Sequence, residues 1–193
     1  MIPTEPKWKA LIVGTLGDPI FTPEQCQQII NTGRRETRVT AEVGGQATGQ
    51  LDTKKRTSYI SWIPFKNMKP MYEKIESTMK KINQNHFGYD GMEITEMAQY
   101  TEYPEGGFYE WHIDSDITCE HEPPVRKISM TLLLSPESEF EGGHLEITSQ
   151  DKVAPIKQGH AIFFASYLQH RVKPVTRGIR RSLVMWFGGP PLK

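Results

Sequence analysis

The chain has 193 residues, of which 37% are apolar and 24% charged, and it fits one globular domain because domains usually contain roughly 100 to 200 residues. Lys plus Arg and Asp plus Glu both total 23, so the chain lacks the broad positive field of a dedicated nucleic-acid binder. No apolar run approaches the roughly 20 residues that span a bilayer, so we expect no membrane partner. The N-terminus lacks a signal-peptide pattern, and two cysteines are too few for a disulfide framework, so we expect a cytoplasmic protein.

A first, short helix is predicted directly after Thr22. The threonine hydroxyl can cap the helix, and Pro23 suits the first helical position. Gln25 stands three residues after the cap, where its side chain can complete a capping box. Apolar residues then fall on one helical face before Gly33, where we expect the helix to end.

A second, longer helix is predicted over Lys66 to His86. Its apolar residues follow one another at steps of three and four, which aligns them as one stripe: Met68, Met71, Tyr72, Ile75, Met79 and Ile82. We interpret this methionine-rich stripe as core packing rather than as a cofactor site. Between the two helices, the segment from Glu42 to Arg56 is polar and rich in glycine, which predicts a mobile loop.

From Gly91 onward, short apolar or alternating runs separated by turn residues predict strands. The predicted strands cover Glu93–Tyr103, Tyr109–Asp114, Lys127–Leu134, His144–Ile147, His160–Ala165, His170–Val175 and Arg181–Phe187. Many strands behind two helices favour an α+β fold that is mainly β, a sandwich or jelly roll with the helices on one outer face. A parallel doubly wound sheet is the weaker alternative.

His112 and Asp114 form the first candidate for a functional site. They stand two residues apart in a predicted strand, where alternate side chains point to the same side. Together with His170 from a later strand, they would supply two imidazoles and one carboxylate. Such a facial triad suits Fe(II) and leaves three coordination positions open.

Arg180 follows His170 by ten residues, and we expect it on the neighbouring antiparallel strand. A guanidinium near a metal is suited to binding the far carboxylate of a dicarboxylate whose other end chelates the metal, which implies 2-oxoglutarate. The alternative is that Arg180 and Arg181 are a solvated pair at the start of a strand.

The stretch Gly106–Asp114, GGFYEWHID, closely resembles the metal-binding strand of prolyl 4-hydroxylases in the iron(II) and 2-oxoglutarate dioxygenase superfamily. The resemblance continues upstream in Arg56–Trp62 and downstream in 126–134, 141–147, 158–164 and 170–187, which together cover roughly two thirds of the chain. Two positions depart from particular subgroups. Arg180 stands where collagen-type enzymes usually present lysine, and Leu133 stands where the oxygen-sensing group has a second tyrosine.

The resemblance implies a single dioxygenase domain over residues 1–193. Its core would be a double-stranded β-helix, a jelly-roll and cupin-like barrel, over about 91–190, with a helical and strand buttress over about 1–90. The resemblance also implies roles for individual residues: Fe(II) binding and catalysis by His112, Asp114 and His170, 2-oxoglutarate binding by Arg180 and Tyr103, and substrate binding by Tyr109, Arg126, Trp186, Arg56 and Trp62. It further implies O2 as a cosubstrate and ascorbate as a reductant.

The function that this resemblance implies is hydroxylation of prolyl residues in a peptide or protein, with release of succinate and CO2. The expected partner is therefore a proline-containing peptide or protein rather than a nucleic acid, and the loop from Glu42 to Arg56 would close over it as a lid. Two alternatives stay open: the same oxygenase chemistry on another amino-acid side chain, a free amino acid or a small molecule, and a catalytically silent peptide-binding barrel. The oligomeric state is also left open.

Overall fold

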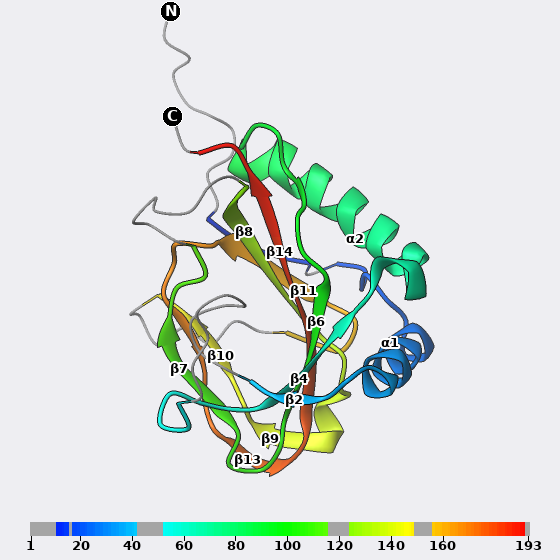
Figure 1. Ribbon diagram of the computed structural model, residues 1–193, viewed down its shortest axis with the longest axis vertical. Helices are drawn as coiled ribbons and strands as arrows, with labels where there is room; N and C mark the ends of the chain where they lie inside the picture. Colours follow the sequence, from blue (N-terminus) through cyan, green and yellow to red (C-terminus); the bar gives the residue numbers. More distant parts are fainter. Residues whose placement is uncertain (1–10, 16, 42–51, 116–123, 149–155, 192–193) are drawn as a thin grey trace, which may run out of the picture.

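The structure is a computed structural model, and it describes residues 11–15, 17–41, 52–115, 124–148 and 156–191 (Figure 1). In these ranges, every strand pairs antiparallel with its neighbours, and the strands form two sheets and a two-stranded ribbon. Most of the predicted lid, Cys119 and His121 lie outside the described residues.

The larger sheet of the described chain has eight strands, with β14 between β8 and β6. Its spatial order is β1 (Ile12–Gly14), β11 (Ala161–Ala165), β8 (Val125–Leu133), β14 (Arg180–Gly189), β6 (Ala98–Tyr103), β4 (Tyr59–Ile63) and β2 (Val39–Thr40), with β5 (Glu93–Ile94) also paired to β14.

The smaller sheet faces the larger one. Its order is β10 (Leu145–Ile147), β12 (His170–Val172), β7 (Phe108–His112) and β3 (Arg56–Thr57). The ribbon pairs β9 (Phe140–Gly142), which follows the 3₁₀ turn η3 (Glu137–Glu139), with β13 (Val175–Gly178). Side chains from both sheets meet in one buried apolar cluster, to which Tyr103 and Phe164 contribute from the larger sheet and Leu145 and Val172 from the smaller. The two sheets therefore enclose a common interior, with β7 and β10 set apart from β6 and β14 in Figure 1.

Helix α1 (Pro23–Arg35) begins where the sequence predicts. Thr22 Oγ1 accepts a hydrogen bond from the Gln25 N–H, and Gln25 Oε1 accepts one from the Thr22 N–H, so the predicted capping box is confirmed. The predicted end was wrong, because the helix passes through Gly33 before it stops. This glycine is a packing residue: a Cβ at its position would lie 2.4 Å from Tyr100 Cγ.

The predicted helix over Lys66 to His86 is divided into three pieces: the 3₁₀ turn η1 (Phe65–Asn67), α2 (Lys69–Ile82) and the π-helical turn η2 (Asn83–Phe87). Pro70 has no N–H to donate to Lys66, so it is accommodated in the first turn of α2 rather than inside a continuous helix. The predicted stripe is confirmed as core, since Met71, Tyr72, Ile75 and Met79 are buried. Among the described helices, none has the length and apolar character needed to cross a membrane.

The two faces of the larger sheet differ in character. The outer face packs in the main hydrophobic core together with residues of α1 and α2, which lie along the same side of the sheet in Figure 1. Alternate residues point to the interior, and there the sheet carries buried polar side chains: Gln99, Thr101, Ser129, Thr131, Arg180 and Ser182. Buried polar groups need partners, so this interior is suited to a polar ligand rather than to core packing.

Several strand predictions were wrong in extent. Glu93–Tyr103 is divided into β5 and β6, His170–Val175 is divided into β12 and β13, and the strand expected to reach Asp114 ends at His112. Strands β1 to β4 were not predicted from periodicity. They contain two to five residues each, too few for a repeating pattern to be recognised.

Candidate metal centre and active site

Two strands of the smaller sheet bring His112 and His170 together. His112 is the last residue of β7, His170 is the first residue of β12, and the two are direct partners in the antiparallel ladder. Directly opposed residues hold their side chains close, and the two imidazole centroids are 4.0 Å apart. Strand pairing alone thus brings together two predicted ligands that are far apart in the sequence.

Asp114 completes the cluster from a turn beyond β7. The N–H groups of Asp114 and Ser115 donate to the Ser166 carbonyl at 2.9 and 3.1 Å, and this turn presents the carboxylate. The expectation that one regular strand would hold both His112 and Asp114 was therefore wrong, although the two side chains do meet. Asp114 Oδ1 lies 3.6 Å from His112 Nε2, and Oδ2 lies 3.4 Å from His170 Nε2. One possible ligand atom from each residue falls within 4.8 Å of the others, as a metal site requires.

Two buried serines hold the carboxylate in place. Ser129 Oγ donates to Asp114 Oδ2 at 2.7 Å, and Ser166 Oγ lies 3.0 Å from Ser129 Oγ. Both serines are fully buried. Sequence reasoning missed them, although Ser129 and Thr131 are polar residues at alternate positions of the otherwise apolar segment 128–133 of β8, which indicates that one of its faces is not ordinary core.

Backbone contacts orient both histidine rings. His112 Nδ1 lies 2.8 Å from the Glu110 carbonyl oxygen, and His170 Nδ1 lies 3.0 Å from that of Leu168. A ring that donates from Nδ1 keeps a lone pair on Nε2, and both Nε2 atoms face Asp114.

The three groups shift one another's pKa. Burial and the nearby His170 lower the pKa of His112 to about 3. Burial would also lower the pKa of His170, but the Asp114 carboxylate outweighs burial and raises it. Burial would raise the pKa of Asp114, yet His170, His112 and the Ser129 hydroxyl hold it well below its usual range. The ionised Asp114 and the neutral His112 are therefore in the protonation states that bind metals.

Arg180 approaches the interior from the larger sheet. It begins β14, whose neighbours are β6, β8 and β5, so the expectation that Arg180 stands on the strand beside His170 was wrong. The side chain is only 1% exposed, and its Nη1 donates to Ser182 Oγ at 3.2 Å. Its Nη2 has no hydrogen-bond partner among the described residues.

Tyr103 is the ladder partner of Arg180, and the guanidinium carbon lies 5.6 Å from the centre of its ring. Tyr103 also belongs to the apolar cluster that contains Phe164, and the Phe164 ring lies 4.6 Å from that of His170. These contacts connect the Arg180 end of the interior with the histidines.

Two of the residues predicted to bind substrate lie beside His112. The Tyr109 ring stacks on the His112 ring with a centroid separation of 3.5 Å, and burial raises the pKa of the Tyr109 hydroxyl to about 12. The Arg56 guanidinium carbon lies 4.5 Å from the centre of the same tyrosine ring. Arg56 Nη2 also donates to Gln99 at 3.0 Å, so this arginine joins the two sheets.

The other three predicted substrate residues, Trp62, Arg126 and Trp186, lie close to one another. Trp186 is the ladder partner of Ser129, and its ring centroid lies 6.1 Å from that of Trp62. The Arg126 guanidinium carbon lies 4.1 Å from the centre of the Trp186 ring and forms a two-point ion pair with Glu96, a residue that was not predicted. Trp186 Nε1 is buried and has no hydrogen-bond partner among the described residues.

The remaining described histidines lie apart from this cluster, as the sequence suggests. His144 is exposed, His160 contacts Thr15, and His86 lies in η2. None of these three belongs to the group that could hold a metal.

The family profile described as the 2OG-Fe(II) oxygenase superfamily matches residues 98–188. A PKHD-type hydroxylase of Idiomarina loihiensis is 31% identical over 169 residues, which cover 82% of this chain and 75% of that relative. A PKHD-type hydroxylase of Acidovorax ebreus is 33% identical over 93 residues, and this match covers 46% of this chain and only 41% of the relative.

Two solved structures share the fold. The viral collagen prolyl hydroxylase of Paramecium bursaria Chlorella virus-1, in complex with 2OG, aligns with a TM-score of 0.72 at 21% identity over 93% of this chain and 97% of the viral one. A Pseudomonas putida prolyl-4-hydroxylase aligns with a TM-score of 0.70 at 20% identity over 94% of each chain. The predicted fold, mainly β with a double-stranded β-helix core, is thereby confirmed.

Proposed function

Because the chain belongs to the 2OG-Fe(II) oxygenase superfamily, and is thus a dioxygenase that uses Fe(II) and 2-oxoglutarate, we propose that it hydroxylates prolyl residues in a peptide or protein. The PKHD-type relatives and the prolyl hydroxylases among the structural neighbours support this choice of reaction.

Iron binding is assigned to His112, Asp114 and His170. The donor set suits the metal, since two imidazole nitrogens and one carboxylate oxygen converge within 4.8 Å. A facial set of three protein ligands leaves positions for the keto-acid and for O2. The hydrogen bond from Ser129 keeps one carboxylate oxygen occupied, which favours a single orientation of Asp114 toward the metal.

The distal carboxylate of 2-oxoglutarate is assigned to Arg180. This assignment rests on one observation: a guanidinium that is 1% exposed has an Nη2 without a hydrogen-bond partner among the described residues. An unpartnered buried donor is costly, and a carboxylate would satisfy it with a charge-assisted hydrogen bond. We assign a hydroxyl contact with the same ligand to Tyr103, and its position directly opposite Arg180 in the ladder supports this role.

When bound, Fe(II) and 2-oxoglutarate supply the oxidation, in which O2, the keto-acid and a substrate C–H bond give succinate, CO2 and a C–OH group. The chain's own contribution is to bind, orient and exclude water. Its buried serine and backbone contacts fix the three ligands, and Arg180 orients the cosubstrate. Trp62, Trp186 and Tyr109 offer aromatic surface beside the ligands, which suits a proline ring.

Substrate turnover by the reconstituted enzyme is the direct test. The protein is loaded anaerobically with Fe(II) and 2-oxoglutarate and then given O2 with a panel of proline peptides and their alanine counterparts. We expect succinate formation and an added oxygen atom on the proline peptides alone, measured by mass spectrometry. Modification of a different side chain, or of free amino acids only, would refute the prolyl assignment while leaving the oxygenase chemistry intact.

Alanine variants test the ligand set in the same assay. His112→Ala, Asp114→Ala and His170→Ala should each abolish turnover, whereas His144→Ala, which removes an exposed histidine, should leave it unchanged. Full activity in any of the first three would contradict the assignment.

Two further proposals concern the setting of the enzyme. A cytoplasmic location is supported by the low cysteine count, and the absence of a nucleic-acid partner is supported by the balanced charge. The single-domain organisation over residues 1–193 and the use of ascorbate stay predictions.

A further inference from the structure

A cavity lies on the outer face of the larger sheet, away from the metal cluster. It has a volume of about 440 Å³ and lies between the end of α1 and strands β4 and β6. The residues that matter for its chemistry are Arg34, Arg38, Tyr59, Tyr100, Glu102 and Ile179. None of them has a role in the proposed oxygenase site.

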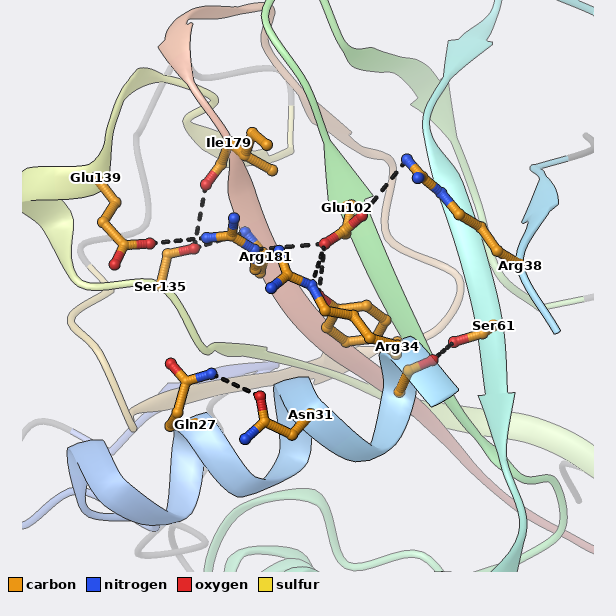
Figure 2. Close-up of polar contacts among 12 residues, drawn as sticks. Gln27, Asn31, Arg34, Arg38, Ser61, Glu102, Ser135, Glu139, Ile179 and Arg181 are labelled. Atoms are coloured by element: carbon orange, nitrogen blue, oxygen red, sulfur yellow. Dashed lines mark hydrogen bonds and ion pairs between the residues drawn. The ribbon is translucent and has the colours of Figure 1, made fainter. Parts of the chain in front are cut away.

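A carboxylate that accepts several hydrogen bonds, that of Glu102, forms one side of this cavity. Glu102 Oε1 accepts hydrogen bonds from Arg34 Nε at 3.1 Å, from the Tyr100 hydroxyl at 2.8 Å and from Arg181 Nε at 3.4 Å (Figure 2). Its Oε2 lies 3.5 Å from Arg38 Nη2. Burial would raise the pKa of Glu102, but Tyr100 and the arginines outweigh burial and lower it, so the carboxylate stays ionised.

Positive charge exceeds negative charge in this cluster. Arg34, Arg38 and Arg181 carry three positive charges, while Glu102 and Glu139 carry two negative ones, because Glu139 pairs with Arg181 Nη1 at 2.7 Å. Since Arg181 contacts both carboxylates, the surplus positive charge resides on the two arginines that line the cavity.

Arg34 and Arg38 are also accessible. Their side chains are 47% and 58% exposed, and in the described part of the chain each forms an ion pair with Glu102 alone. Each contact uses one nitrogen of a guanidinium that carries five N–H donors. The Arg38 guanidinium also rests on the Tyr59 ring, with its carbon 3.9 Å from the ring centre, which restrains its orientation.

We propose that this cavity binds a small ligand that carries an oxyanion, a phosphate or a carboxylate, between Arg34 and Arg38. Forked guanidiniums match the geometry of both anions. Tyr59 and Ile179 offer apolar surface for the body of the ligand, and the ionised Glu102 directs the anion toward the exposed ends of the two arginines.

The proposed anion site and the proposed cosubstrate pocket lie on opposite faces of the same two strands. Arg180 pairs with Tyr103 on the inner face, and the adjacent rung pairs Arg181 with Glu102 on the outer face. Figure 2 shows Arg181 and Glu102 on their neighbouring strands, with Arg34 approaching from the helix. The two ligands should therefore bind together rather than compete.

Calorimetry on the complete enzyme tests the site. The protein is held under argon with Fe(II) and one equivalent of 2-oxoglutarate, which supplies the cosubstrate pocket without an excess of free carboxylate, and is titrated with inorganic phosphate or with propionate. We expect saturable binding of at least one of these anions. Binding of phosphate alone would assign the site to phosphate-bearing ligands, and binding of propionate alone would assign it to carboxylates.

Variants locate the binding. Arg38→Gln should raise the dissociation constant of the anion by about tenfold or more, because it removes one charged partner of the anion. Arg34→Gln should do the same, while Arg35→Gln, an exposed arginine on the same helix that does not line the cavity, is the matched control and should have no effect. Thermal melts confirm that each variant is folded, and the exposure of Arg38 makes it the safer of the two changes.

Two results would overturn the proposal. These are an absence of saturable binding of either anion by the native protein, and equal losses in Arg35→Gln and Arg38→Gln. The readout is heat of binding, so failure here is independent of whether the enzyme hydroxylates proline.

Discussion

Replacing Ser129 by alanine should weaken iron binding without altering the ligand set. Ser129 Oγ donates to Asp114 Oδ2 at 2.7 Å from a position that is completely buried. A hydrogen bond to a buried charged group contributes about 1.5 to 3 kcal/mol. At about 1.4 kcal/mol for each factor of ten, the Fe(II) dissociation constant should rise roughly 10- to 100-fold, in the range found when outer-shell partners of metal ligands are removed.

The assay is an anaerobic competition titration of Fe(II) between the protein and a coloured chelator. Ser61→Ala provides the control, because Ser61 is equally buried and donates to the Gly33 carbonyl at 2.6 Å, yet contacts the opposite side of the larger sheet. That variant should lower the free energy of unfolding by about 1 kcal/mol and leave iron affinity unchanged. A Ser129→Ala protein whose Fe(II) affinity stays within about twofold of the native value would show that the Ser129 hydroxyl does not support the metal site, as would an equal loss in the control.

Three other predictions concern stability and reactivity. Because the pKa of Glu102 is lowered in the folded state, its contribution is complete at neutral pH and is lost as the pH falls through the folded-state pKa. Glu102→Gln should therefore lower the free energy of unfolding by about 1 to 3 kcal/mol at pH 7, measured by urea unfolding. The difference from the native protein should shrink as the pH falls below the usual pKa range of a glutamate carboxyl, and a constant difference would contradict this. Gly33→Ala places a Cβ 2.4 Å from Tyr100 Cγ, so it should lower the melting temperature and destabilise the protein by about 1 to 3 kcal/mol. Gly17→Ala is the control, because no described atom lies within 4 Å of the new Cβ, and it should leave the melting temperature nearly unchanged. Burial raises the pKa of the Cys26 thiol to about 11. Alkylation of Cys26 at neutral pH, mapped by mass spectrometry, should therefore be slow in the native protein and fast in urea. Rapid labelling of the native protein would show instead that the thiol is accessible.

Local patterns predicted the elements that have enough residues to show them. The capping box at Thr22 and the buried stripe of α2 were identified because each depends on spacings within a few turns of helix. Most of the longer strands were located for the same reason, to within a few residues. Their assignment to two different sheets was not predicted, because alternation along a strand does not say which strand it pairs with.

Arg180 illustrates this limit. The sequence predicted Arg180 on the strand next to His170, but the chain uses the intervening residues to form β13, which pairs with β9, and only then enters the larger sheet. Asp114 is a second case: the carboxylate reaches the histidines from a turn that Ser166 holds, and no feature near Asp114 in the sequence points to a partner so far along the chain.

The polar interior was the least predictable feature. An alternating strand is normally read with its apolar face buried and its polar face in water. In β8 both faces are buried, so Ser129 and Thr131 form part of the wall of the site. Side chains that contact a ligand cannot be distinguished from solvated ones by polarity alone.

Strand β14 sends consecutive arginines in opposite directions, Arg180 to the interior and Arg181 to the outside. Inserting or deleting a single residue before them would reverse the faces to which they point, and it would turn Leu183, Met185 and Phe187 out of the main core and toward the site. This strand should accept many substitutions yet tolerate no change in its length, so a mutagenesis library aimed at new substrates should vary residue identity here and place any insertion elsewhere.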